Sequence, residues 1–266
     1  MPSEHQSKVL DQFTKLAGAF ASAPQFTDTE ALDLLLAATD ASAMDASLDV
    51  ACGAGVVATH FARKVRHATG IDLTPAMLAK ARERQTTAGV GNVTWDEGDA
   101  SCMPYADNSF SIVTSRYAIH HMPEPMRVLA EMTRVCRPSG RVAISDISLP
   151  DDQSAADAFN RIERFNDPSH AHALTNFEWT NLFIEAGLPA PTIARYQIEF
   201  PLLRMLQTSN VPKEQAEAVE REVRDRLAQG QLQFCAKLER DRCVFVYPIA
   251  VMSAVKAGTC TSRGTR

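Results

Sequence analysis

Short apolar runs alternate with amphipathic segments along the central part of the chain. Five such runs are found, at residues 47–51, 67–73, 92–97, 111–115 and 141–147. Continuous apolar runs of this length are typical of strands buried on both faces of a sheet. Between them, apolar residues recur at helical spacing, as at Ala58, Phe61 and Val65. This alternation predicts a parallel sheet with helices on both faces.

The pattern changes on either side of this central part. The other expected elements are helices at 8–21, 28–38, 175–187 and 213–228 and strands at 192–200 and 242–253. Thr175 and Glu178 have the spacing of a capping box, which supports a helix start at that point. After Pro150 the strand–helix alternation stops, and a polar stretch runs to about residue 174. Within this insert, the polar group at 163–172 is expected to be a loop over the carboxyl edge of the sheet.

Composition and charge narrow the class of protein. The 266 residues are 45% hydrophobic and 22% charged, which is ordinary for a globular α/β protein. The net charge of −5 argues against a sequence-independent nucleic-acid binder, which needs a basic surface. The six cysteines have no CxxC spacing and are interpreted as reduced thiols. The sequence shows no leader pattern and no spanning segment, so a cytoplasmic protein without stable membrane insertion is expected.

The first apolar run leads into a glycine turn, Asp49-Val50-Ala51-Cys52-Gly53-Ala54-Gly55. Glycine between a strand and a helix lets the backbone approach a ligand closely, and a helix N-terminus favours negative charge. Asp72 ends the second run, where a carboxylate can accept hydrogen bonds from ribose hydroxyls. These features fit either NAD or S-adenosylmethionine as the cofactor.

Three later segments favour one of these cofactors. They are Gly98-Asp99-Ala100-Ser101-Cys102-Met103-Pro104, the run 105–110 and the run 137–140. With these motifs the sequence resembles the class I S-adenosylmethionine-dependent methyltransferases, over about residues 10–255. It is most similar to the small-molecule branch that includes the ubiquinone/menaquinone C-methyltransferases. Ala51 stands where the family has its first glycine, and a methyl group is tolerated there if φ is negative, which we therefore expect.

The resemblance implies a Rossmann-like α/β fold. We expect a seven-stranded, mostly parallel sheet with an antiparallel last strand, helices on both faces, an N-terminal helical cover and inserted lid helices. The chain is expected to form one methyltransferase domain. Its parts are the cover (1–45), the cofactor-binding core (46–148), the substrate-side insert and helices (149–240), the last strand (241–256) and a flexible tail (257–266).

The resemblance also implies the residues around the cofactor S-adenosyl-L-methionine and its product S-adenosyl-L-homocysteine. Asp72 is expected to hold the ribose, and Asp99 the edge of the adenine. Met77 is expected to flank the adenine, although a methionine at helical spacing is more often part of a core. The full set of implied cofactor contacts is Asp49, Ala51, Cys52, Gly53, Gly55, Asp72, Leu73, Met77, Asp99, Ala100 and Ser115.

The acceptor side carries fewer signals. His120 and His121 lie in a segment that the resemblance places beneath the methyl group, so they are the candidates for a general base. Because neighbouring side chains point in different directions, at most one of the two is expected to reach the substrate. The expected substrate contacts are Phe20, Arg116, Tyr117 and His170. The sequence has no metal-ligand spacing, and no metal is expected.

The expected function is therefore transfer of a methyl group from S-adenosylmethionine to carbon, oxygen or nitrogen of a small organic acceptor, a quinone-type or secondary metabolite. Two alternatives stay open: an NAD-dependent oxidoreductase, and a non-catalytic S-adenosylmethionine-binding regulatory protein. A monomer or a homodimer is expected, with a small-molecule partner and no nucleic acid.

Overall fold

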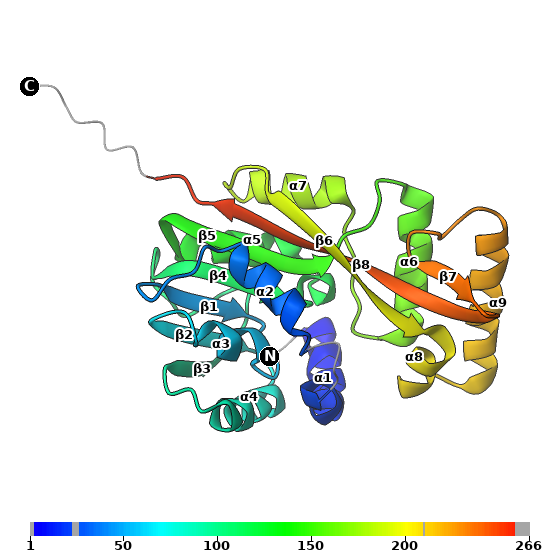
Figure 1. The fold of residues 1–266 in the computed structure, drawn as a ribbon, viewed down its shortest axis with the longest axis horizontal. Helices are drawn as coiled ribbons and strands as arrows, with labels where there is room; N and C mark the ends of the chain where they lie inside the picture. Colours follow the sequence, from blue (N-terminus) through cyan, green and yellow to red (C-terminus); the bar gives the residue numbers. More distant parts are fainter. Residues whose placement is uncertain (1–2, 23–26, 210, 259–266) are drawn as a thin grey trace, which may run out of the picture.

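The computed structural model describes residues 3–22, 27–209 and 211–258, without the side chains of residues 19–22. Its centre is a sheet with the strand order β3-β2-β1-β4-β5-β8-β6, and β7 pairs with β8 (Figure 1). The strands are β1 (Ala46–Val50), β2 (His67–Asp72), β3 (Val93–Glu97), β4 (Phe110–Arg116), β5 (Cys136–Ile147), β6 (Thr192–Pro201), β7 (Ala236–Glu239) and β8 (Arg242–Val255). The predicted Rossmann-like fold is confirmed, with β7 as a short addition that the sequence pattern did not indicate.

The strand directions agree with the expected sheet. The strands β3, β2, β1, β4 and β5 pair in parallel, and β8 runs antiparallel to β5 and to β6. Because β8 is reversed relative to both neighbours, β6 runs in the same direction as the parallel strands. The carboxyl ends of β1, β2, β3 and β4 therefore meet at one edge of the sheet, where ligands bind in open α/β sheets.

Helices cover both faces of this sheet (Figure 1). On one face, α2 and α3 pack against Ala68, Ile112 and Ala143, and on the other, α5 and α7 pack against Val142 and Ile144. Neighbouring residues of β5 thus enter opposite cores, because side chains of a strand alternate between its faces. The helices are α1 (Glu4–Ser22), α2 (Thr29–Ala37), α3 (Val56–Phe61), α4 (Pro75–Ala88), α5 (Pro125–Val135), α6 (Gln153–Asn166), α7 (Asn176–Glu185), α8 (Leu202–Thr208) and α9 (Lys213–Ala228).

The polar stretch after Pro150 begins with a helix, so the loop expected at 163–172 starts only after residue 166. This helix is α6, whose N-cap Asp152 accepts a hydrogen bond from the backbone of Ala155. The buried residues Ala156, Phe159 and Ile162 recur every three positions, so a narrow apolar face is enough to hold an otherwise polar helix. The expectation of a loop was wrong for residues 163–166, because this apolar face is masked by the charged residues around it.

A second apolar core lies beyond the central sheet. The long strands β6 and β8 extend past the other strands, and α6, α8 and α9 gather at their far end (Figure 1). Phe159 stacks on Phe245 with ring centroids 5.4 Å apart, which joins α6 to β8. The helices α6, α8 and α9 are therefore anchored to the sheet by a core of their own. The predicted division of the chain into parts remains a prediction.

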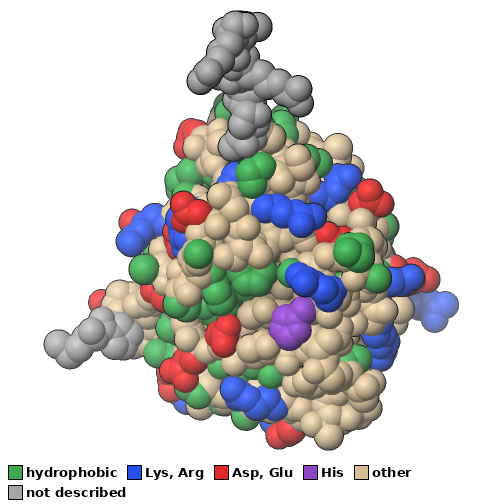
Figure 2. All heavy atoms as spheres, turned by 90° about the vertical axis from the view of Figure 1, so that its left-hand side faces the viewer, with side chains coloured by type: hydrophobic (Ala, Val, Ile, Leu, Met, Phe, Trp, Pro, Cys, Tyr) green, Lys and Arg blue, Asp and Glu red, His purple; other side chains and the backbone are tan. Residues whose placement is uncertain are grey.

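The surface of the described residues carries charges of both signs. Figure 2 shows basic and acidic side chains interspersed over one face of the molecule. Within the described ranges, no helix combines the length and apolar character needed to cross a bilayer.

Candidate active site

A cavity of about 750 Å³ lies at the carboxyl ends of the parallel strands. This volume falls in the range of small-molecule sites. It brings together most of the residues predicted for the cofactor and the substrate: Asp49, Ala51, Cys52, Gly53, Asp72, Leu73, Met77, Asp99, Ala100, Arg116, Tyr117 and His121 line its wall. Met77 is also 3% exposed and belongs to a small core with Ala17 and Ala54, so it is both a core residue and a part of the cavity wall.

The glycine turn bends by placing three residues in the left-handed region of backbone conformation. The φ angles are 54° at Ala51, 52° at Gly53 and 72° at Gly55. The expectation of a negative φ at Ala51 was therefore wrong. The strand β1 ends at Val50, and the N–H of Cys52 still donates to the carbonyl of Ile71 on the neighbouring strand β2.

The two glycines of the turn serve different purposes. A Cβ on Gly53 would meet no atom within 4 Å, so its backbone borders open space. A Cβ on Gly55 would lie 2.4 Å from Cη2 of Trp95, so this glycine permits close packing. Gly55 does not line the cavity, contrary to its predicted role as a cofactor contact.

Asp72 holds the glycine turn in place. Its Oδ2 accepts the N–H of Gly53 at 2.7 Å, and its Oδ1 accepts the N–H of Thr74 at 2.8 Å. Burial raises the pKa of Asp72, and these two backbone donors partly offset that effect. Each carboxylate oxygen retains a second lone pair, so a ligand hydroxyl can still be accepted.

Asp49 lies behind the turn and is buried. Its Oδ2 accepts the N–H of Ala58 in the first turn of α3 at 3.2 Å. Burial raises its pKa to about 7, although the bonds from Ala58 and Thr114 act in the opposite direction. A positively charged ligand in the cavity would favour the ionised form of this carboxyl.

The first turn of α1 closes the cavity over Asp99. The Nε2 of Gln6 donates to Oδ2 of Asp99 at 2.7 Å, and Nε2 of His5 lies 2.7 Å from the carbonyl oxygen of His121. The sequence analysis missed both residues because it began this helix at residue 8. A signal was present: Ser3 and Gln6 exchange the two hydrogen bonds of a capping box.

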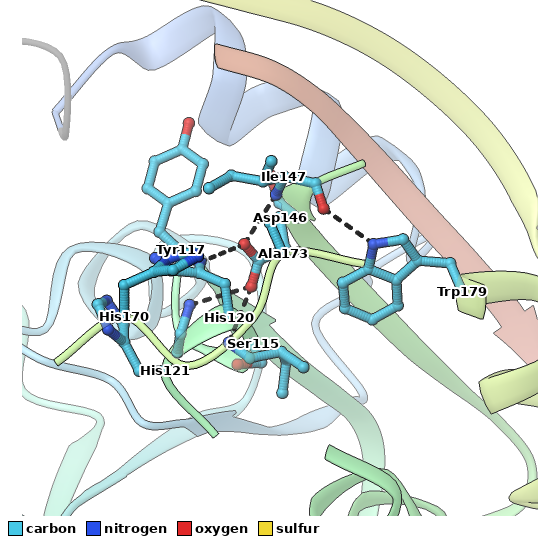
Figure 3. A network of polar contacts seen from close by, with 12 residues as sticks. Ser115, Tyr117, His120, His121, Asp146, Ile147, His170, Ala173 and Trp179 are labelled. Atoms are coloured by element: carbon cyan, nitrogen blue, oxygen red, sulfur yellow. Dashed lines mark hydrogen bonds and ion pairs between the residues drawn. The ribbon is translucent and has the colours of Figure 1, made fainter. Parts of the chain in front are cut away.

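The two neighbouring histidines have different surroundings. His121 lines the cavity, whereas His120 does not and turns towards Asp146 (Figure 3). The Nδ1 of His120 lies 2.5 Å from Oδ1 of Asp146. Burial acts to lower the pKa of His120, but the negative charge of Asp146 prevails and raises it.

Asp146, at the end of β5, organises this segment and was missed by the sequence analysis. It is fully buried and accepts the N–H groups of Ala118, Ile119 and Ile147 in addition to His120. Its place at the carboxyl end of a strand was the signal that could have identified it, as it identified Asp72. Burial opposes its ionisation, but His120 holds its pKa below the ordinary value.

Two predicted contacts lie away from the cavity wall, and a third has a side chain outside the described residues. His170 is buried, bonds through Nε2 to Oδ1 of Asn160 at 2.7 Å, and does not line the cavity. Burial lowers its pKa to about 2. Ser115 is also absent from the wall, because its hydroxyl points into the sheet and donates to the carbonyl of Val50. The side chain of Phe20 lies outside the described residues.

Arg116 and Tyr117 form the wall beside β4. The guanidinium of Arg116 lies 4.3 Å from the centroid of the Tyr117 ring, and its Nη2 donates to the Tyr117 hydroxyl. That hydroxyl also bonds to the hydroxyl of Tyr196 on β6. Tyr117 has a φ of 53°, so the backbone turns sharply where β4 ends. Among the described residues no group of His, Cys, Asp and Glu side chains forms a metal site.

The chain is similar to known proteins in both sequence and fold. Residues 48–144 match the family described as methyltransferase domain. The methyltransferase YcgJ of Bacillus subtilis (strain 168) is 27% identical over 229 residues, which cover 86% of this chain and 90% of YcgJ. The crystal structure of BH2331 from Bacillus halodurans C-125 superposes with a TM-score of 0.77 at 28% identity, covering 85% of this chain and 98% of BH2331.

A quinone methyltransferase is also similar over the central part. The ubiquinone/menaquinone biosynthesis C-methyltransferase UbiE of Roseobacter denitrificans is 38% identical over 125 residues. This match covers 44% of the present chain and 50% of UbiE, so the similarity spans about half the length of that relative.

Proposed function

From the premise that residues 48–144 form a methyltransferase domain in a class I fold, we propose that the chain transfers a methyl group from S-adenosyl-L-methionine to a small organic acceptor. The observation that carries the proposal is one cavity that joins the glycine turn, Asp72 and Asp99 to His121. It provides a place for the methyl donor and, at its other wall, a place for the acceptor.

The residues present fit this donor. Open space beside Gly53 allows a ligand to approach the backbone of the turn. Asp72 and Asp99 offer carboxylate acceptors for ribose hydroxyls and for an exocyclic amine. When bound, S-adenosylmethionine supplies a methyl group on a positively charged sulfur, and the acidic lining formed with Asp49 is complementary to that charge.

The acceptor wall supplies orientation and a base. Methyl transfer is an in-line displacement, so the protein acts chiefly by positioning the reactants and excluding water. The first turn of α1 covers the cavity, and Arg116, Tyr117 and His121 also line it. We assign the role of general base to His121 rather than to His120, because His121 lines the cavity. A quinone-type acceptor is supported by the similarity to UbiE, and an oxygen or nitrogen acceptor uses the same arrangement.

Cofactor binding gives a direct test. S-adenosylhomocysteine at a hundred times its dissociation constant is expected to stabilise the fold by about 2.7 kcal/mol, as measured by thermal unfolding. Asp72→Ala is expected to weaken this binding at least tenfold, about 1.4 kcal/mol, as measured by calorimetry. Glu97→Ala, which removes an exposed carboxylate from the end of β3, is the matched control and should bind normally.

The outcomes separate this proposal from its alternatives. Stabilisation by NADH and not by S-adenosylhomocysteine would show that the cofactor is wrong. Binding of S-adenosylmethionine without methylation of any hydroquinone, phenol or amine in a broad panel, followed by mass spectrometry, would favour a regulatory binding protein.

A further inference from the structure

The loop after α6 holds a serine in a fixed orientation. The Oδ1 of Asp167 accepts both the N–H of Ser169 at 2.8 Å and its hydroxyl at 2.6 Å. Ser169 is fully buried, so water does not compete for these bonds. The hydrogen of the Ser169 hydroxyl is therefore directed to Asp167, and the lone pairs of that oxygen are left for another donor.

That donor is the ring of His121. Its Nδ1 lies 3.2 Å from the carbonyl oxygen of Ser169 and 3.2 Å from the Ser169 hydroxyl oxygen. A carbonyl oxygen can only accept a hydrogen bond, and the hydroxyl hydrogen already points to Asp167. Both partners of Nδ1 are thus acceptors, so Nδ1 carries the hydrogen, and the neutral ring has its lone pair on Nε2.

The Nε2 of His121 opens towards the cavity. His121 lines the cavity wall. Among the described residues its Nε2 has no hydrogen-bond partner, and this nitrogen is not one of the polar atoms that are both buried and unpaired. Phe13 on α1 lies edge-on to the ring with the centroids 5.0 Å apart. The ring is therefore held from the loop side by Ser169 and from the α1 side by Phe13.

The charges around His121 favour the neutral ring. Burial lowers the pKa of His121 to about 4, and the positive charge of His120 contributes to this effect, because the two ring centroids are 4.1 Å apart. Asp167, the Ser169 backbone and Asp146 act in the opposite direction and are outweighed. Since Asp146 keeps the pKa of His120 raised, His120 is the member of the pair that takes a proton first.

We propose that Asp167 and Ser169 are positioning residues that fix the Nδ1–H tautomer of His121, so that its Nε2 presents a lone pair to the acceptor. This inference rests on the proposed function, in which His121 faces the acceptor. It also defines the class of acceptor, which must carry a hydrogen that it loses on methylation. With the donor bound, the acceptor atom would form a bond to the methyl carbon as the carbon–sulfur bond breaks and its electron pair stays on sulfur. The hydrogen of the acceptor would leave as a proton to Nε2, so that the positive charge passes from the sulfur to the imidazole.

The tautomer can be measured without knowing the acceptor. In the full chain labelled with ¹⁵N-histidine, long-range ¹H–¹⁵N spectra at pH 7 are expected to show a protonated Nδ1 and an unprotonated Nε2 for His121. Its signals are assigned by their loss in His121→Gln. A His121 ring that is protonated on Nε2, or on both nitrogens, at pH 7 would overturn the proposal.

Three variants test the role of the loop. Asp167→Ala removes the acceptor that holds Ser169, and is expected to shift a measurable fraction of His121 to the Nε2–H form. Asp167→Asn keeps an oxygen at that place and should restore the wild-type tautomer without the charge. Asp157→Ala, which removes an exposed carboxylate from α6, is the matched control. An unchanged tautomer in a folded Asp167→Ala protein would refute the positioning role.

Binding of S-adenosylhomocysteine to the same samples keeps the two proposals apart. If the ligand does not bind to the wild-type chain, the proposed function fails, whatever the tautomer. If it binds and the tautomer is the wrong one, the proposed function stands and the role of Asp167 and Ser169 is refuted. Should Asp167→Ala fail to fold, the wild-type spectrum and Asp167→Asn still decide the outcome.

Discussion

Single residues with left-handed backbone conformations shape the floor and wall of the cavity. Ala51 and Gly53 turn the chain from β1 towards α3, and Tyr117 turns it at the end of β4. Glycine adopts this conformation without steric cost, whereas an L-residue with a Cβ is strained there. Ala51 therefore carries strain at a position where the resemblance leads one to expect glycine.

Replacing Ala51 by glycine is expected to relieve this strain. Ala51→Gly should raise the free energy of unfolding by about 1 kcal/mol, measured by denaturant titration of the protein without ligand. Gly53→Ala is the converse change. The Cβ added at residue 53 would contact no atom within 4 Å. The free energy of unfolding is expected to fall by about 1 kcal/mol, and this decrease reports the backbone strain alone. Equal or lower stability of Ala51→Gly would contradict the assignment.

At the scale of elements, α1 closes the cavity through its first turn. Gln6 serves two purposes there: its Oε1 accepts the N–H of Ser3 in the capping box, and its Nε2 donates to Asp99. The helix also meets His121 through His5 and Phe13. A ligand that enters the cavity must displace these contacts or use them, so the stability of this turn governs access.

Loss of the Gln6 side chain is expected to open the first turn of α1. Gln6→Ala removes the capping partner and the hydrogen bond to Asp99. This loss is expected to lower the local stability of the turn by about 1 kcal/mol. Hydrogen exchange of the amides of residues 4–9, followed by mass spectrometry, should become roughly fivefold faster. Thr14→Ala on the exposed side of α1 is the control, and residues 125–135 should exchange at the wild-type rate in both variants. Wild-type exchange in Gln6→Ala would show that this turn is held by other contacts.

At the scale of the whole molecule, the described residues pack into two parts. One is the central sheet with its helices, and the other is the core formed by α6, α8 and α9 on the far ends of β6 and β8. The second core contains a buried carboxyl, Glu163, which accepts the hydroxyl of Tyr247 at 2.8 Å. Burial raises the pKa of Glu163 to about 7. Folding must therefore bury a negative charge when the pH is above that value.

This carboxyl makes stability depend on pH in a defined direction. The folded protein binds the Glu163 proton more tightly than the unfolded chain, in which this carboxyl has its ordinary pKa of 4.5. The stability from this group is complete below 4.5 and is lost as the pH rises to about 7, by at most roughly 3 kcal/mol. Glu163→Gln keeps the acceptor for Tyr247 and should flatten the decline in unfolding free energy between pH 5 and 8.

Two comparisons keep the pH experiment specific. Asp49, whose pKa is also raised to about 7, titrates in the same window, so a part of the decline should remain in Glu163→Gln. Glu214→Gln on the exposed start of α9 should follow the wild-type curve. A decline of the full wild-type size in Glu163→Gln would exclude Glu163 as its source.

The sequence by itself determined the sheet and the side of the cavity that the glycine turn forms. Buried parallel strands are continuous apolar runs, and the residues that follow them reach one edge of the sheet by chain direction alone. The positions of Asp49, Gly53, Asp72 and Asp99 at the cavity therefore followed from local order along the chain.

Only the tertiary structure decided which of the two neighbouring histidines lines the cavity. His120 and His121 are neighbours in sequence, and nothing local tells which one faces the cavity. The difference comes from Asp146 on β5 and from Asp167 and Ser169 on the loop after α6, which lie far away along the chain. Hydrogen bonds between distant segments leave no periodic pattern in a sequence, so the orientation and the proton position of a side chain are set only when the chain has folded.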